Sequence, residues 1–168
     1  MIFKSNNPYP KVQVEQPNLF YASILLDDYA GNLSEDTAIH LYLYQAFVDD
    51  EHYNQYKDIM LHIAEVEMTH LRLLGETIMK LGALPIFGVV GKDRVDRLWS
   101  ASNVNYEIDL KQMLEIDIQA ETNAIRNYEY QLNIIKDVYI QAMIKRILED
   151  EKIHLSIFQN LYQNLVTY

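Results

Sequence analysis

Two copies of a Glu-x-x-His motif lie inside apolar helical patterns, and together they constrain the fold more than any other feature of the sequence. The first copy is Glu67-x-x-His70 and the second is Glu151-x-x-His154. Residues three apart lie on one face of a helix, about one turn apart, so each carboxylate can bind the same ion as its imidazole. A single copy would be weak evidence, because a solvated helix face produces this spacing by chance. The significance of the motifs depends on their surroundings.

Length and composition describe one acidic globular domain. We expect residues 1–168 to form a single domain with a sizeable core, preceded by an extended lead-in at residues 1–18. A net charge of −10 argues against nucleic acid or an anionic membrane as a partner. The sequence has no cysteine, which excludes disulfides, thiolate zinc sites, iron–sulfur clusters and thiol catalysis. It has neither an apolar run of about 20 residues nor a signal-like N-terminus, so the expected location is the cytoplasm.

Apolar residues at helical spacing predict four long helices, at about residues 19–48, 51–81, 106–135 and 137–165. Gly82 is a suitable end for the second helix and Asp137 a suitable N-cap for the fourth. Gly31 falls inside the first pattern and marks a weak point in it. Residues 49–51 resemble a tight turn, whereas residues 83–104 break the periodicity, show no strand signal and form a long connection. The fold predicted is an all-α, antiparallel four-helix bundle.

The two halves of the chain resemble each other. Glu35 and Glu121 coincide at an offset of 86 (121 − 35), and the two Glu-x-x-His motifs coincide at an offset of 84 (151 − 67). Further pairs at the offset of 86 are Ala38/Ala124, Ile39/Ile125, Tyr42/Tyr128, Tyr44/Tyr130 and Gln45/Gln131. The chain therefore looks like a duplicated helical hairpin. Each half carries one Glu on its first helix and a Glu-x-x-His motif on its second.

The four glutamates and two histidines of these positions can share one level of the bundle. Counted from the connecting turns at 1.5 Å per residue, all of them lie roughly 22–26 Å from the same bundle end. Apolar residues such as Ile39, Ile63 and Phe158 occupy the same helix faces, so the acids would point into the core. Burying four bare carboxylates costs several kcal/mol each. Two divalent cations would neutralise the four negative charges.

Carboxylate oxygen with imidazole nitrogen suits iron or manganese, and the absence of thiolate disfavours structural zinc. We therefore predict a site for two metal ions, with iron as the first expectation and manganese as the second. The predicted metal ligands are Glu35, Glu67, His70, Glu121, Glu151 and His154. The alternative is that these acids and histidines face solvent on a metal-free structural bundle.

These six residues, with the stretch HLRLLGETIMKLGALP after the first motif, resemble the ferritin-like superfamily of di-iron and di-manganese carboxylate proteins. The most similar member is the erythrin domain of rubrerythrins, and the resemblance covers about residues 19–165. It implies that His70 and His154 each supply a nitrogen to one metal. It also implies that Glu67 and Glu151 form the bridging pair.

The resemblance extends to Tyr42 and Tyr128, which match tyrosines that hydrogen-bond a ligand carboxylate across the bundle, although both also suit a simple aromatic core. Two features depart from rubrerythrins. Ala124 replaces an additional Glu, and the four-cysteine rubredoxin module is missing, which removes the built-in electron donor. Met68 matches the position of a haem-binding Met in bacterioferritins, so a haem remains an alternative.

The function expected from this resemblance is redox chemistry on hydrogen peroxide or dioxygen. With iron and an external electron donor the protein would be a peroxidase, and with manganese it would be a catalase. The alternative is a ferritin-like protein that oxidises and stores iron. Because no fifth helix follows residue 165, we expect a small assembly, most simply a homodimer.

Overall fold

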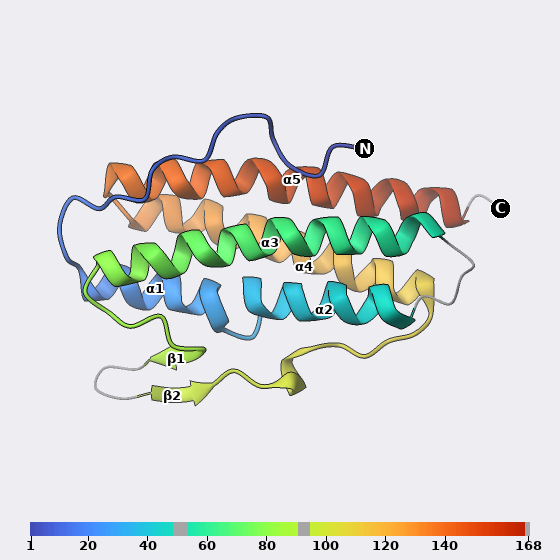
Figure 1. Ribbon diagram of the computed structural model, residues 1–168, viewed down its shortest axis with the longest axis horizontal. Helices are drawn as coiled ribbons and strands as arrows, with labels where there is room; N and C mark the ends of the chain where they lie inside the picture. Colours follow the sequence, from blue (N-terminus) through green and yellow to red (C-terminus); the bar gives the residue numbers. More distant parts are fainter. Residues whose placement is uncertain (49–53, 91–94, 167–168) are drawn as a thin grey trace.

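The computed structural model describes residues 1–48, 54–90 and 95–166, which fold as an antiparallel bundle of helices (Figure 1). The helices are α1 (Leu19–Ala30), α2 (Glu35–Val48), α3 (Asn54–Lys80), α4 (Leu110–Ile134) and α5 (Val138–Val166). Helix α2 packs along α3 and α4 packs along α5, so both predicted hairpins are present. The turn predicted at residues 49–51 lies outside the described residues. None of the described helices is long and apolar enough to cross a membrane.

The first helix is divided in two, which corrects the prediction of one continuous helix over residues 19–48. Helix α1 ends at the weak point in the pattern, where the Gly31 N–H donates to the Asp27 carbonyl oxygen at 2.8 Å. A Cβ at Gly31 would collide with that same oxygen. Ser34 then precedes α2 and accepts a backbone N–H of its first turn at 3.3 Å. Glu35 is consequently the first residue of α2, where the helix dipole favours a negative charge.

The connection between α3 and α4 contains a short β-hairpin, which corrects the prediction of a connection without strands. Strands β1 (Gly88–Val90) and β2 (Val95–Leu98) pair antiparallel beside the bundle (Figure 1). The pairing gives partners to backbone groups that no helix satisfies. Gly88 allows the strands to approach, because a Cβ there would collide with the Arg97 carbonyl oxygen.

Local capping signals set three helix ends. Gly82 follows α3 with a φ of +94°, and this left-handed conformation confirms it as the predicted stop. The Asp137 carboxylate accepts the backbone N–H two residues later at 3.0 Å and caps α5, as predicted. Helix α4 begins at Leu110 rather than near residue 106, because the Asp109 side chain accepts a first-turn N–H at 3.0 Å.

A polar layer divides the apolar core into two clusters. One cluster packs α1 against the ends of α3, α4 and α5 near the α4–α5 connection, and it includes Leu25, Leu74 and Ile144. The other packs α2 against the opposite ends of the same helices and includes Ile63 and Phe158. Buried Glu and His side chains occupy the layer between these clusters.

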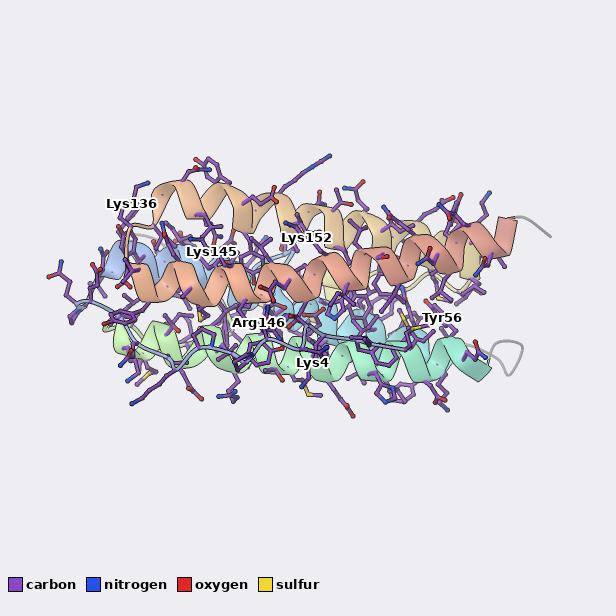
Figure 2. All side chains as sticks on the ribbon, turned by 90° about the horizontal axis from the view of Figure 1, so that it is seen from above. Lys4, Tyr56, Lys136, Lys145, Arg146 and Lys152 are labelled. Carbon is purple, nitrogen blue, oxygen red and sulfur yellow. The ribbon has the colours of Figure 1, made fainter. Side chains whose placement is uncertain are left out.

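The N-terminal segment, residues 1–18, is extended and runs along the bundle beside α5 (Figure 1). The Arg146 Nε of α5 donates to the Asn7 carbonyl oxygen at 2.6 Å, and the Glu15 N–H donates to the Asp137 carboxylate at 2.7 Å. Figure 2 shows Arg146 between α5 and α3, where this segment lies. The segment is therefore attached to the N-terminal cap of α5 and to a residue further along this helix.

Candidate metal centre

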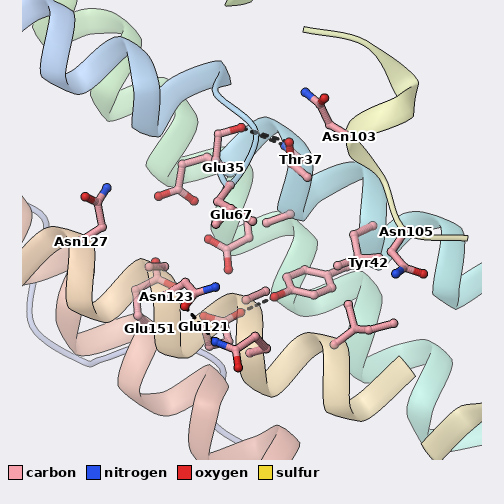
Figure 3. A pocket seen from close by; sticks show the side chains of 18 of the residues that line it. Glu35, Thr37, Tyr42, Glu67, Asn103, Asn105, Glu121, Asn123, Asn127 and Glu151 are labelled. Carbon is pink, nitrogen blue, oxygen red and sulfur yellow. Dashed lines mark hydrogen bonds between the residues drawn. The ribbon is translucent and has the colours of Figure 1, made fainter. Parts of the chain in front are cut away.

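Three carboxylates and one imidazole gather at each of two adjacent positions in the polar layer. The first group is Glu35, Glu67, His70 and Glu151, and the second group is Glu67, Glu121, Glu151 and His154. In each group, one candidate ligand atom per residue lies within 4.8 Å of all the others. All six side chains are at most 6% exposed. The structure therefore brings together every residue that the sequence predicts as a metal ligand, and the labelled carboxylates converge in Figure 3.

Glu67 of α3 and Glu151 of α5 belong to both groups. The other four residues belong to one group each. A carboxylate has two oxygens and can bind two cations at once. Glu67 and Glu151 thus occupy the positions that a bridging pair requires.

Both imidazoles direct Nδ1 into the cluster. The His70 Nδ1 lies 2.8 Å from Glu67 Oε2 and 3.0 Å from Glu151 Oε1, and the His154 Nδ1 lies 2.9 Å from Glu67 Oε1. The ring centroids are 6.3 Å apart. Nδ1 is therefore the nitrogen available to a metal in each group, and Nε2 points outward.

Several atoms of the cluster have no hydrogen bond of acceptable geometry to any described residue, although His154 Nδ1 lies 2.9 Å from Glu67 Oε1 and His70 Nδ1 lies 3.0 Å from Glu151 Oε1. The atoms without such a bond are Glu67 Oε1, Glu121 Oε2, Glu151 Oε1 and His154 Nδ1. A buried polar atom without a partner costs free energy, and for a charged group the cost is large. Cations at the two positions would satisfy these atoms and balance the acids, so the donor set fits two metal ions.

Protons balance the charge of the metal-free cluster. Burial, reinforced by the neighbouring carboxylate charges of Glu67 and Glu151, raises the pKa of Glu35 and Glu121 well above its usual range. Burial alone would lower the pKa of His154, but the Glu67 and Glu151 carboxylates outweigh it and raise this pKa to about 10. The cluster thus binds cations or protons at neutral pH.

Two tyrosines donate hydrogen bonds across the bundle to Glu35 and Glu121, the two glutamates that each belong to only one ligand group. The Tyr42 hydroxyl on α2 donates to Glu121 on α4, and the Tyr128 hydroxyl on α4 donates to Glu35 on α2. Both tyrosines are buried. Because each bond joins one half of the duplication to the other, it orients a candidate ligand from the opposite hairpin.

The sequence matches the Rubrerythrin family over residues 31–162. The chain belongs to the rubrerythrin family. It is 28% identical to a probable manganese catalase from Clostridium acetobutylicum, over 89% of this chain and 73% of that protein. It is 31% identical to a bacterioferritin from Desulfovibrio desulfuricans, over 74% of this chain and 65% of that protein. Its fold is similar to that of a manganese catalase from Anabaena PCC7120, with a TM-score of 0.84 at 24% identity, covering 98% of this chain and 81% of that chain.

This rubrerythrin-family site also depends on two groups that the sequence did not predict. The His70 Nε2 lies 3.0 Å from the Asp150 carboxylate, and the His154 Nε2 lies 2.9 Å from the Phe3 carbonyl oxygen. Asp150 is fully buried and also accepts the Tyr9 hydroxyl at 2.6 Å. The two outer imidazole nitrogens are thus held by α5 and by the N-terminal segment.

The only sequence signal for Asp150 is its place immediately before the second motif. The equivalent residue before the first motif is Val66, so the duplication does not reveal it. Arg146 lies one helical turn before Asp150, and its guanidinium Nη1 is 2.6 Å from Asp150 Oδ1. Burial alone would raise the pKa of Asp150, but its hydrogen bonds from His70, Tyr9 and Arg146 lower it to about 2. A permanent carboxylate therefore faces the outer nitrogen of His70.

Asp150→Asn is expected to lower metal affinity by roughly 10–100-fold, because the outer partner of a ligating His sets its orientation and basicity. The measurement is the free metal concentration at half-loading. The matched control is Glu149→Gln, since Glu149 accepts the Ser5 hydroxyl at 2.6 Å and holds the N-terminal segment without touching His70. Equal losses in both variants would show that only attachment of the segment matters.

A pocket of about 560 Å³ reaches the cluster between α2 and α4. Glu35, Glu67, Glu121 and Glu151 line its inner part, together with Tyr42 (Figure 3). A water occupies roughly 30 Å³ in the liquid, so the pocket has room for a small molecule with several waters. The cluster is therefore buried in the bundle but reachable from one side.

Two further residues singled out from the sequence, Ala124 and Met68, are not part of this rubrerythrin-family cluster. Ala124 lines the pocket, and it is the position at which the sequence resemblance implies an additional Glu. Met68 is 47% exposed and points away from the buried layer. Its position leaves the six-residue cluster unchanged.

Proposed function

We propose that this chain is a di-manganese oxidoreductase of the catalase type, which converts two hydrogen peroxide molecules into dioxygen and two waters. The observation that carries the proposal is the pair of carboxylates, Glu67 and Glu151, shared by two groups of candidate ligand atoms. Shared carboxylates would hold two cations side by side. His70 and His154 would complete the two groups through Nδ1.

Two manganese ions, when bound, would each change between +2 and +3 and so supply and take back the two electrons of peroxide chemistry. The protein side chains orient the site and control access. Tyr42 and Tyr128 hold the two terminal carboxylates, and the surrounding apolar clusters restrict access to the pocket between α2 and α4. Peroxide would approach the cluster from that pocket.

Two observations support a catalase over a peroxidase. The 168 residues contain no cysteine, so no thiolate-bound iron within them can deliver electrons. The relative from Clostridium acetobutylicum that matches 89% of this chain is a probable manganese catalase. A catalase needs no external electron donor, because the second peroxide reduces the site.

Manganese-loaded protein is expected to release dioxygen continuously, with one dioxygen for every two peroxides consumed. The measurement combines an oxygen electrode with peroxide absorbance. Metal-free protein and free manganese at the same concentration are the controls. The same experiment on iron-loaded protein should consume about one peroxide per pair of ferrous ions and then stop until a reductant is added. Continuous dioxygen release with iron but none with manganese would overturn the assignment of the metal.

The second candidate function is iron oxidation and storage. It is favoured by the bacterioferritin from Desulfovibrio desulfuricans, whose crystal structure is described as containing a diiron site and resembles this fold with a TM-score of 0.70 at 25% identity. If manganese gives no dioxygen and aerobic ferrous iron yields many ferric ions retained per chain, this candidate replaces the first. The homodimer predicted from the sequence stays a proposal in either case, and the external electron donor was predicted only for a peroxidase.

A further inference from the structure

The duplication places two buried aspartate–glutamine pairs beside the cluster. The Gln131 Nε2 on α4 donates to Asp28 Oδ1 on α1 at 2.8 Å, and the Gln45 Nε2 on α2 donates to Asp117 Oδ1 on α4 at 2.8 Å. The two glutamines are equivalent in the repeat, each three residues after a cluster tyrosine. Each hairpin therefore binds one buried carboxyl group of the other.

The two aspartates differ in the surroundings of their Oδ2 atoms. Asp117 is fully buried, its Oδ2 lies 3.4 Å from the Tyr56 hydroxyl, and it is absent from the pocket lining. Asp28 is 3% exposed and lines the pocket that reaches the cluster. Asp28 Oδ1 accepts the Asn127 amide at 2.6 Å as well as Gln131, whereas Asp28 Oδ2 has no hydrogen-bond partner among the described residues.

The surroundings of Asp28 favour its neutral form. Burial is the largest effect and raises its pKa to about 8, and the Asp27 charge on the same helix adds to it. The two amides oppose this effect without reversing it. On α4 the nearby titratable group is Tyr128, while Glu35 of α2 and Glu67 of α3 line the same pocket. Among the residues that the structure describes, no Lys or Arg lines this pocket, so Asp28 holds a proton at neutral pH.

This arrangement points to a role for Asp28, resting on the proposed catalase function. We propose that Asp28 is a proton relay, whose carboxyl group gives up a proton toward the pocket when one peroxide is reduced and regains it when the next is oxidised. Asp28 lines the same pocket as Tyr128 and Glu35, and Glu35 is the cluster residue that accepts the Tyr128 hydroxyl. Asp28 belongs to neither ligand group, and because its Oδ2 is buried, a water must reach this atom from the pocket for the proton to exchange.

The proton count is balanced over one cycle. Reducing one peroxide to two waters consumes two electrons and two protons, and two metals, when bound, would supply the electrons. Oxidising the second peroxide to dioxygen releases two electrons and two protons, and the metals would take the electrons back. Asp28 stores one of these protons between the half-reactions, and the other passes through water in the pocket to solvent.

The test compares Asp28→Asn with Asp117→Asn in the manganese-loaded protein. The Asn oxygen can still accept Asn127 and Gln131, so the packing is kept while the exchangeable proton is lost. The wild-type rate should fall as pH rises through about 8. Asp28→Asn should be slower, on the order of a hundredfold as for loss of an acid–base group, and should lose this pH dependence. Asp117→Asn should retain it, and both variants should bind two metals per chain.

A second measurement does not depend on activity. The infrared carbonyl stretch of a protonated carboxyl group should disappear between pH 7 and 9 in manganese-loaded wild type and in manganese-loaded Asp117→Asn, where cations would replace the protons of Glu35 and Glu121. This change should be missing in manganese-loaded Asp28→Asn. An unchanged rate and pH profile in Asp28→Asn, or equal effects of both variants, would overturn the relay. If wild type releases no dioxygen with manganese, the proposed function fails, whereas the infrared titration still reports whether Asp28 carries the proton.

Discussion

Replacing Glu67 by alanine is expected to remove both metals and to abolish peroxide turnover. Like Glu151, Glu67 belongs to both groups of ligand atoms, and its side chain is 1% exposed. Its removal takes one oxygen from each group at once, which no water-exposed neighbour can replace. The loss of metal affinity should exceed the roughly 10–100-fold expected when only an outer hydrogen bond is lost.

The measurement is metal content per chain after dialysis, followed by dioxygen release. Glu35→Ala provides a comparison inside the cluster, because Glu35 belongs to the first group alone and its loss should weaken one metal more than the other. Glu65→Ala is the external control, since Glu65 lies exposed on the same helix and should leave both properties unchanged. Two retained metals and undiminished turnover in Glu67→Ala would falsify the assignment of this cluster as the active centre.

Removing the metals is expected to lower the melting temperature by roughly 15–30 °C. A ligand at a thousand times its dissociation constant stabilises the folded state by about 4 kcal/mol, so two sites contribute about 8 kcal/mol. One kcal/mol corresponds to about 2–4 °C for a domain of this size. Thermal unfolding with and without a chelator, followed by circular dichroism, measures the shift.

The stability of the metal-free protein should also fall as pH rises from 6.5 to 10. The folded pKa values of Glu35, Glu121, His70 and His154 are all raised, to about 10 for His154. A group with a raised folded pKa contributes stability that is complete below its unfolded pKa and is lost as pH rises through its folded pKa. For the histidines this window opens near pH 6.5.

Two cluster residues, Glu67 and Glu151, change the stability with pH in the opposite direction. Burial would raise the pKa of Glu67 and Glu151, but interactions with His154 and His70 outweigh it and lower both. Their contribution is lost only on acidification below the unfolded value of 4.5 and cannot offset the fall at high pH. Metal-loaded protein should show a flat profile over the same range, because cations replace the protons. Equal melting temperatures of both forms across this range would contradict a buried metal site.

The sequence by itself determined that the chain forms a helical bundle and which residues form the cluster, but it did not predict that the first helix is divided into α1 and α2. Glu67 and His70 are three positions apart, and a regular helix places such residues on one face whatever surrounds it. The same motif recurs at Glu151 and His154, and Glu35 and Glu121 lie at matching distances from the turns. In an antiparallel bundle, these positions all fall at one level. These inferences depend on local periodicity and on duplication, which a single sequence records directly.

Only the tertiary structure decided what surrounds the cluster. The outer partners of the two imidazoles are Asp150 and the Phe3 carbonyl oxygen, and the second comes from a backbone atom that carries no residue signature. The difference between Asp28 and Asp117 arises because the pocket reaches one of them, while Tyr56 lies beside the other. Such contacts join residues far apart in the chain, and side-chain packing selects them from many arrangements with the same helical pattern. Periodicity fixes which face a residue occupies, whereas the partner it meets there depends on the packed bundle.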